Sequence, residues 1–369
     1  MRDNDAEHDD GPYTDGDARK ADIDGRRKLR DSDVPSSPVH PGSMQSDMTD
    51  DQTNIVIGVD IGGTKVAAGL VDSHGQILAR NVKPMVANGD ASQGFEAITA
   101  AVSGVLSGAG AQRSIAAIGV CAPGPLDPNA GVVINPPNVP CWRNFPLAKE
   151  MRKVYGVPVT VDNDANAAAL AEARWGAGRG YRNVFYTCIG TGIGTGIVMD
   201  GRIYHGRTGA AGEGGHVGID PKGPLCNCGK RGCIEALASG NAIASRARAK
   251  LRRNPKSLLL EMAGGELEAV SSETVGKAYA AGDAVAREVM EETLDAIVYW
   301  LANIIDLLEP DIIVIGGGVS TLLAPILDDI RRRLRGACVN PSAEDIPLVI
   351  AHYGEDAGIA GAASLCDLK

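Results

Sequence analysis

Residues 55–65 read Ile-Val-Ile-Gly-Val-Asp-Ile-Gly-Gly-Thr-Lys, an apolar run that ends in an acidic residue and a glycine turn. A short apolar run bounded by glycine is typical of a buried strand. The pattern recurs at residues 184–197, where Val-Phe-Tyr-Thr-Cys-Ile precedes Gly-Thr-Gly-Ile-Gly-Thr-Gly and a returning apolar segment. Two copies of strand, glycine turn and strand predict an internally duplicated α/β fold with a cleft between two lobes.

The rest of the chain continues this alternation of strands and helices. We expect further strands at residues 65–71, 76–81, 115–122, 157–161, 197–200 and 312–315. We expect helices at residues 91–106, in the alanine-rich stretch after Asp164, and along an apolar face from Val285 to Leu308. The predicted first lobe covers residues 54–175 and is completed by a C-terminal helix at about 355–369. The predicted second lobe covers residues 176–354.

Charge and composition set the first 53 residues apart. Residues 1–53 carry 14 acidic and 7 basic side chains, whereas the remainder carries 32 and 29. The first segment has almost no large apolar residues, so it is predicted to be a disordered acidic tail. Nucleic acid and anionic membranes need a basic face, which neither part offers. A signal segment and a membrane-length apolar run are also missing, so we expect a cytoplasmic protein without nucleic-acid or membrane partners.

Residues 213–235 gather the side chains that bind zinc. The segment begins Glu-Gly-Gly-His and ends Cys-Asn-Cys-Gly-Lys-Arg-Gly-Cys-Ile-Glu. One imidazole and three thiolates make a full tetrahedral set for structural zinc, here His216, Cys226, Cys228 and Cys233. Disulfides are the alternative, but they are typical of small secreted scaffolds. The other five cysteines are predicted to be ordinary buried thiols: Cys121, Cys141, Cys188, Cys338 and Cys366.

Three glycine clusters each follow an apolar strand, at residues 62–63, 190–196 and 316–318. Glycine lets backbone N–H groups approach a phosphate closely, because no side chain intervenes. The dinucleotide fingerprint and the P-loop pattern are both absent. Any one cluster is compatible with a simple hairpin turn, but the three together, with Asp60 before the first, favour phosphate binding.

These motifs carry a family resemblance. The segments 60–65, 163–166, 190–196 and 213–216 and the Cys-x-Cys-Gly-x-x-Gly-Cys-x-Glu run occur in the order found in the ROK family (repressors, ORFs and kinases). The similarity extends from about Asn54 to the C-terminus. It implies the two-lobed, duplicated ribonuclease-H-like fold that sugar kinases share with actin and Hsp70, with ATP between the lobes and a zinc-stabilised loop.

The resemblance also implies a nucleotide site. The ATP phosphates would be bound by Asp60, Gly62, Gly63, Thr64 and Lys65 in the first turn and by Thr191, Gly192, Ile193 and Gly194 in the second. The adenosine would lie against Gly316, Gly317 and Gly318. Asp60 would act on Mg²⁺, through water.

A sugar site and a general base are implied in the same way. Asp164 corresponds to the family's catalytic aspartate, with Asp162 as the local rival and helix capping as the structural alternative. The implied sugar contacts are Gly124, Asn138, Asn163, Asp164, Glu213, His216 and Glu235. One departure is Gly214, because the family usually has a bulky residue between the glutamate and the Gly-His pair. A glycine there predicts a looser sugar loop, which is the segment around residues 213–216.

The residues therefore predict an ATP-dependent hexose kinase. Segments 135–142 and 235–240 are similar to the glucokinase branch, which makes glucose 6-phosphate. A kinase of N-acetylglucosamine or N-acetylmannosamine is the alternative, with the same base and zinc. A sugar-sensing regulator is a weaker alternative, because its DNA-binding domain would occupy the place of the acidic tail. The resemblance also favours a homodimer.

Overall fold

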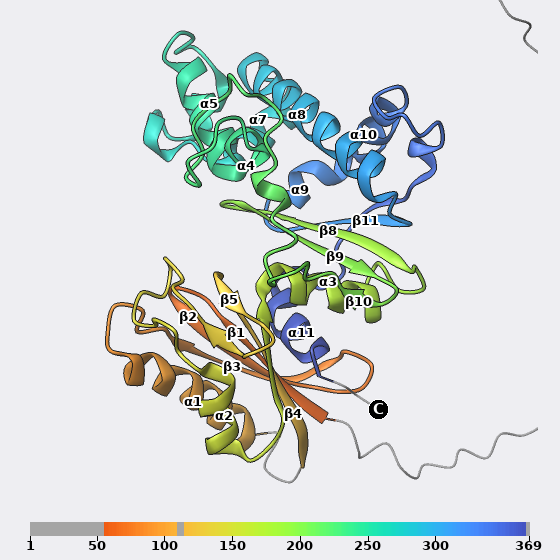
Figure 1. Ribbon diagram of the computed structural model, residues 1–369. Coiled ribbons are helices and arrows are strands. Elements are labelled where there is room, and N and C mark those ends of the chain that lie inside the picture. The colour runs from red at the N-terminus through yellow and green to blue at the C-terminus, as the bar shows by residue number, and fades with distance from the viewer. Residues whose placement is uncertain (1–54, 109–113, 367–369) are drawn as a thin grey trace, which may run out of the picture. The chain divides into compact units, whose positions relative to one another are not determined.

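The computed structural model describes residues 55–108 and 114–366, so the predicted acidic tail lies outside the described residues (Figure 1). Its strands are β1 (Ile55–Ile61), β2 (Lys65–Val71), β3 (Ile77–Pro84), β4 (Ile115–Ala122), β5 (Leu126–Asp127), β6 (Val132–Val133), β7 (Val159–Asn163), β8 (Asn183–Ile189), β9 (Ile193–Met199), β10 (Arg202–Ile203), β11 (Ile312–Gly316) and β12 (Leu348–Ile350). Its helices are α1 (Ala91–Ser107), α2 (Leu147–Tyr155), α3 (Asp164–Arg174), α4 (Ile234–Ala238), α5 (Gly240–Leu251), α6 (Leu258–Met262), α7 (Ser272–Ala280), α8 (Ala284–Leu308), α9 (Ser320–Leu323), α10 (Leu327–Leu334) and α11 (Ala357–Ser364).

The strands form two five-stranded sheets of the same design. The first sheet has the order β3-β2-β1-β4-β7, and the second has the order β10-β9-β8-β11-β12. In the first sheet the central strand β1 pairs antiparallel with β2 and parallel with β4. In the second sheet the central strand β8 pairs in the same way with β9 and β11. Equal order and equal direction confirm the duplicated α/β fold.

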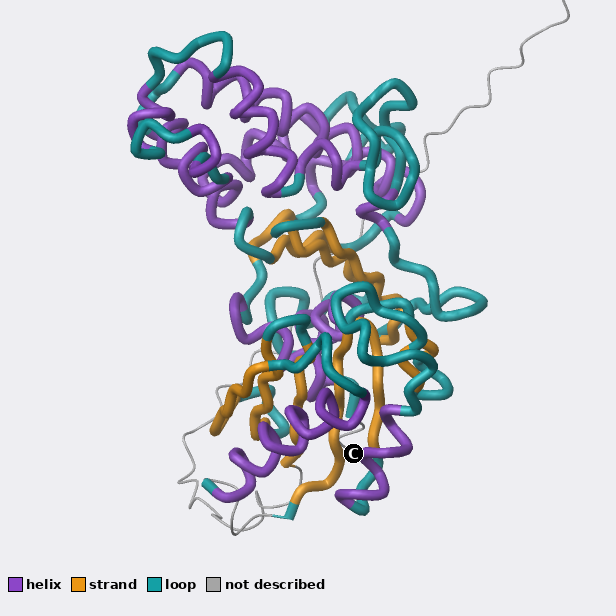
Figure 2. The backbone as a smooth tube through the Cα atoms, turned by 90° about the vertical axis from the view of Figure 1, so that its left-hand side faces the viewer, coloured by secondary structure: helices purple, strands orange, loops and turns teal. Residues whose placement is uncertain are grey.

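Side chains of the second sheet alternate between two hydrophobic clusters. Val184 and Tyr186 pack with Ala169 of α3, whereas Phe185 belongs to the cluster that contains Trp300 of α8. This is the alternation of a strand buried on both faces. Figures 1 and 2 both show the helical region that contains α5, α7 and α8 on one side of this sheet.

Helix α11 packs closely against the first sheet because two glycines in the strands leave space for its backbone. A Cβ atom at Gly58 of β1 or at Gly119 of β4 would overlap a backbone carbonyl of α11. Helix α3 contacts α11 on one side and strands β8 and β9 on the other. The described residues form one compact unit, so the division into lobes at residues 175 and 176 stays a prediction.

Several strand boundaries differ from the expected ones, and β3 covers residues 77–84 rather than 76–81. Strand β9 begins at Ile193, inside the glycine run, rather than at Ile197. Glycine suits this strand because a Cβ at Gly196 would lie 2.6 Å from the Ala165 carbonyl oxygen. Strand β7 covers residues 159–163 rather than 157–161, which places Asp162 within the sheet. Among the helices of the described residues, none combines the length and the apolar character of a membrane span.

Candidate active site

The predicted site residues gather at the carboxyl ends of strands. Asp60 lies near the end of β1, α3 follows β7 directly, and the second glycine turn follows β8. In sheets of this kind ligands bind at the carboxyl ends of parallel strands, where turns and helix N-termini converge. The topology therefore brings the first glycine turn and Asp164 to one edge of the first sheet.

Asp164 is recessed in the protein. Its side chain is exposed to water, yet protein atoms surround it on most sides. Loss of surrounding water raises the pKa of the Asp164 carboxyl. The hydrogen bond from the Ala165 N–H, at 2.8 Å, lowers this pKa, and the negative charge of Asp60 raises it. The capping residue of α3 is Asn163, whose Oδ1 accepts the Ala165 N–H at 2.9 Å. The carboxylate is therefore available to accept a proton from a substrate.

Asp60 shares this environment. It is half-buried, and burial raises its pKa, while a hydrogen bond from the Cys121 thiol at 3.4 Å and the charge of Lys65 lower it. Burial and the charges of Asp60 and Asp164 raise the pKa of Cys121 well above its ordinary value. Two carboxylates close enough to influence one thiol and one another form an anionic centre that suits a divalent cation.

Asp162, the rival base, is committed to structural hydrogen bonds. Its Oδ1 accepts the Asn163 N–H at 2.7 Å and the Asn166 Nδ2 at 3.1 Å. Its Oδ2 lies 2.6 Å from His205 Nε2, and the aspartate is only 3% exposed. A carboxylate with these partners holds the end of β7 and the start of α3, and it is not free to meet a substrate.

The Asp162 pair makes stability depend on pH. The hydrogen bond to Asp162 raises the pKa of His205, partial burial lowers it, and the aspartate charge raises it again, with a net increase. The stabilisation is therefore complete below about pH 6.5, the unfolded value, and is lost as the pH rises through the higher folded pKa. His205→Gln is expected to lower Tm most near about pH 5.5 and least above about pH 8. Thermal melts of both proteins across this range test the prediction, and a Tm difference that grows with pH would contradict it.

The first glycine turn lies beside one predicted sugar residue. The Gly62 N–H donates to the Lys65 carbonyl at 2.9 Å and closes the turn. A Cβ at Gly63 would lie 2.7 Å from the Asn138 carbonyl oxygen, so the loop that carries Asn138 contacts this turn. The side chains of Thr64, Lys65 and Asn138 are exposed at this edge.

Gly124 and Asn163 also lie together. A Cβ at Gly124 would lie 3.8 Å from Asn163 Nδ2. Because the Oδ1 of Asn163 caps α3, its amide nitrogen is the part left to face a ligand. The structure thus brings these two predicted sugar contacts to the start of the helix that carries Asp164.

Glu235 joins the cysteine cluster to the second glycine turn. Its Oε2 accepts the Ile193 N–H at 3.0 Å, and its Oε1 lies 3.7 Å from the Cys226 Sγ. A Cβ at Gly192 would lie 2.5 Å from the same carboxylate. This predicted sugar contact is therefore held by a backbone N–H of the turn, while Glu213 is exposed.

The four predicted metal ligands converge. The distance from His216 Nδ1 to Cys226 Sγ is 3.6 Å, and the Sγ atoms of Cys228 and Cys233 are also 3.6 Å apart. All four donor atoms lie within 4.8 Å of one another. Tetrahedral zinc with Zn–S bonds of about 2.3 Å needs sulfur atoms about 3.8 Å apart, so the donor set and its spacing fit this ion. An approach through Nδ1 leaves Nε2 of His216 for another partner.

The cysteines outside this cluster differ partly from expectation. No disulfide joins any of the eight cysteines, all of which lie within the described residues. Cys121 and Cys366 are buried as predicted. The prediction is wrong for Cys141, Cys188 and Cys338, which are only half-buried.

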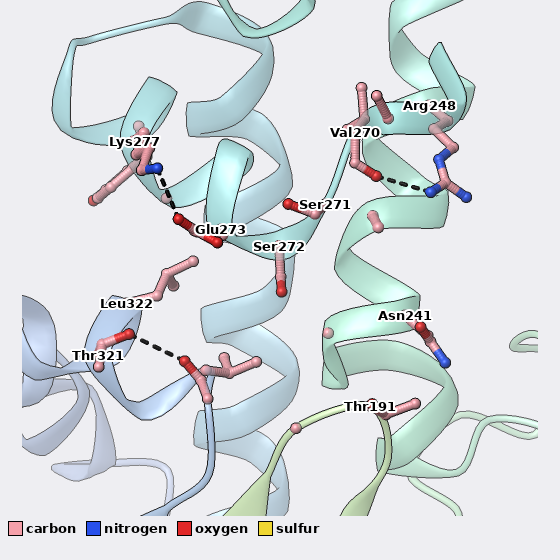
Figure 3. Close-up of a pocket in the computed structure, with 18 of the residues that line it drawn as sticks. Thr191, Asn241, Arg248, Val270, Ser271, Ser272, Glu273, Lys277, Thr321 and Leu322 are labelled. Carbon is pink, nitrogen blue, oxygen red and sulfur yellow. Dashed lines mark hydrogen bonds and ion pairs between the residues drawn. The ribbon is translucent and has the colours of Figure 1, made fainter. Parts of the chain in front are cut away.

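A cavity of about 970 Å³ lies beside the second glycine turn (Figure 3). Its walls come from the turn, from α5 and α7, and from the start of α9. The Arg248 guanidinium donates to the Val270 carbonyl at 2.8 Å, and Lys277 pairs with Glu273 at 2.7 Å. Small-molecule sites have volumes of this order and mix apolar walls with a few polar groups.

The cavity only partly matches the predicted nucleotide contacts. Thr191 and Gly318 line it. Gly316 and Gly317 are not among its lining residues, because they pack against Tyr186 and against the Ile189 backbone. Most of the wall residues are not predicted from the sequence, including Asn241, Arg248, Ser271, Ser272, Lys277 and Leu322. No local signal marks these residues, which are ordinary helix and loop positions that only the fold brings together.

Comparison with known proteins agrees with this architecture. The ROK family model matches residues 56–368. A glucokinase of Thermotoga maritima is 35% identical over 310 residues, which cover 84% of this chain and 96% of that protein. An N-acetylmannosamine kinase of Shigella flexneri is 35% identical over 313 residues, which cover 84% of this chain and 97% of that protein.

A solved structure adds the same relation in three dimensions. The ROK family glucokinase of Streptomyces griseus, in complex with glucose and AMPPNP, is 36% identical, with a TM-score of 0.72. The match covers 86% of this chain and 100% of that one. The predicted actin-like ATPase fold is confirmed. The chain belongs to the ROK family.

Proposed function

We propose that this chain is an ATP-dependent hexose kinase that converts glucose and ATP to glucose 6-phosphate and ADP. The observation that carries the proposal is that the second glycine turn lines the cavity and also packs against the start of the helix that carries Asp164. Thr191 lines the cavity, and the same turn leads into β9, where a Cβ at Gly194 would lie 3.2 Å from Ala165 Cβ, next to Asp164. The glucokinase relatives and the AMPPNP-bound neighbour support glucose and ATP as substrates.

In the proposed reaction Asp164 accepts the proton of the sugar hydroxyl. The hydroxyl oxygen then forms a bond to the γ-phosphorus, and the bond from that phosphorus to the leaving oxygen of ADP breaks. The raised pKa of Asp164 favours this role, because a stronger base removes a hydroxyl proton more readily. The proposed contacts that orient the hexose are Gly124, Asn138, Asn163, Glu213, His216 and Glu235.

Two metal ions complete the proposal. Asp60 would hold Mg²⁺ through water, and its half-buried carboxylate beside Asp164 fits a divalent cation. Bound Mg²⁺ would neutralise charge on the phosphates. His216 and the three cysteines would hold zinc, which would keep the glycine-rich segment folded. A homodimer and a cytoplasmic location remain proposals from the sequence.

A kinase of N-acylhexosamines is the second candidate, because an N-acetylmannosamine kinase is as similar to this chain as a glucokinase is. A coupled assay of ATP consumption with glucose, mannose, N-acetylglucosamine and N-acetylmannosamine separates the two. We expect kcat/KM to be at least about tenfold higher for glucose than for either N-acetyl sugar, since one unmatched substituent typically costs this much or more. The reverse order would establish the second candidate. If none of the four sugars stimulated ATP consumption, both candidates would be contradicted.

A further inference from the structure

Both polar backbone groups of Gly214 are bound by side chains from outside its loop. Its N–H donates to Thr195 Oγ1 at 2.7 Å, and its carbonyl accepts from Trp300 Nε1 at 3.1 Å as well as from the Val217 N–H at 3.1 Å. The Thr195 hydroxyl in turn donates to the Gly212 carbonyl. The prediction that a glycine at position 214 loosens the sugar loop is therefore wrong, because β9 and α8 hold this glycine from two sides.

The two side chains that hold Gly214 are themselves fixed. Thr195 is 4% exposed and Trp300 is fully buried. The indole packs edge to face on Phe185, with ring centroids 5.8 Å apart. Hydrogen bonds in such surroundings do not compete with water, and a buried donor or acceptor that loses its partner is costly. These contacts therefore define the direction of both peptide groups of Gly214.

The contact between Gly214 and Thr195 requires that position 214 have no side chain. A Cβ at position 214 would lie 2.6 Å from Thr195 Oγ1, closer than real Cβ atoms come to other atoms. The next residue is equally confined, because a Cβ at Gly215 would overlap the Ile193 carbonyl of the second glycine turn. The loop is thus seated directly on β9.

We propose that Thr195 and Trp300 are positioning residues that orient Glu213 and His216 toward the hexose. The inference rests on the proposed function, which makes Glu213 and His216 sugar contacts. Glu213 and His216 flank Gly214 and Gly215, and the His216 N–H donates to the Glu213 carbonyl at 3.0 Å. A rotation of the Gly214 peptide groups would therefore move both side chains at once.

The test compares Thr195→Val and Trp300→Phe with a matched control. Thr195→Val keeps the shape of the side chain and removes only the hydrogen-bonding group, whereas Trp300→Phe removes the indole N–H together with part of the ring. The control is Thr293→Val on α8, which also removes a buried hydroxyl that binds a backbone carbonyl, here that of Val289 at 2.7 Å. Its hydroxyl also accepts from Arg246, which donates to the Leu237 carbonyl of α4 as well, and neither bond involves residues 213–217.

We expect each of the two variants to raise the KM and the Kd for glucose about tenfold, the effect of losing one buried hydrogen bond, while kcat changes less than about threefold. Amide hydrogen exchange at residues 213–217 should accelerate about tenfold in both, because the Gly214 peptide groups lose a partner. The control should lower Tm without changing glucose affinity or exchange in this segment. Unchanged exchange and unchanged glucose affinity in both variants would overturn the positioning role.

A second comparison uses the contact at Gly214 itself. Gly214→Ala is expected to weaken glucose binding, because its methyl group displaces the Thr195 hydroxyl. The double variant Gly214→Ala/Thr195→Ala should bind glucose no worse than Thr195→Ala alone, which is the non-additivity of residues in direct contact. Additive losses of glucose affinity in the double variant would contradict the direct contact between Gly214 and Thr195. A wild-type protein that phosphorylates no hexose would refute the proposed function, whereas the exchange measurements would still decide whether Thr195 and Trp300 hold the loop.

Discussion

Asp164→Asn is expected to lower kcat for glucose phosphorylation by at least about 10³-fold, within the range that a general base contributes. Asparagine has nearly the same shape and can still accept the Ala165 N–H through its oxygen, but it cannot take the hydroxyl proton. The Kd for glucose should therefore change less than about threefold. Steady-state kinetics and calorimetric titration with glucose measure the two quantities.

Asp162→Asn is the matched control for this prediction. It makes the same chemical change two residues away, at a carboxylate that binds His205, Asn166 and the Asn163 backbone. We expect a lower Tm and a much smaller loss of kcat than in Asp164→Asn. If the two variants exchanged these effects, Asp162 would be the base and the assignment of Asp164 would be wrong.

Cys228→Ser is expected to reduce bound zinc from about one ion to less than about 0.1 per chain. A serine hydroxyl is a poor ligand for this ion, and the metal supplies much of the folding free energy of a segment with few apolar residues. The KM for glucose should rise at least about tenfold, because the cluster contains His216 and lies next to Glu235. Elemental analysis of the purified protein and steady-state kinetics test both parts.

Cys338→Ser provides the control for the loss of a thiol. Cys338 is half-buried and is not among the four clustered residues. This variant should keep its zinc and its KM for glucose. A Cys228→Ser protein with full zinc content and an unchanged KM would contradict the assignment of Cys228 as a zinc ligand that supports sugar binding.

The sequence was sufficient for the duplicated fold and for the metal cluster, for different physical reasons. A buried strand followed by a glycine turn is a local pattern, and its recurrence at residues 184–197 implied two equivalent sheets. The ligands of the cluster are close in the chain and have distinctive chemistry, so their spacing identified them. The contact between the loop of Asn138 and the first turn could not be read from the chain, because it depends on tertiary packing.

The sequence was insufficient where helices meet across the fold. Arg248 and Lys277 line the cavity from α5 and α7. In the sequence, neither residue can be distinguished from an ordinary charged residue on a helix surface. The same limit explains the wrong expectation at Gly214. A glycine in a loop suggests freedom, and only the structure places Thr195 and Trp300 against its backbone.

The proposed transfer of phosphate to glucose is tested most directly by ³¹P NMR of the purified protein with ATP, Mg²⁺ and glucose. We predict that glucose 6-phosphate and ADP appear in equal amounts, and that neither forms at a comparable rate when glucose is omitted or when Asp164 is replaced by Asn. Release of inorganic phosphate at the same rate with and without a hexose would contradict the assignment of this chain as a hexose kinase.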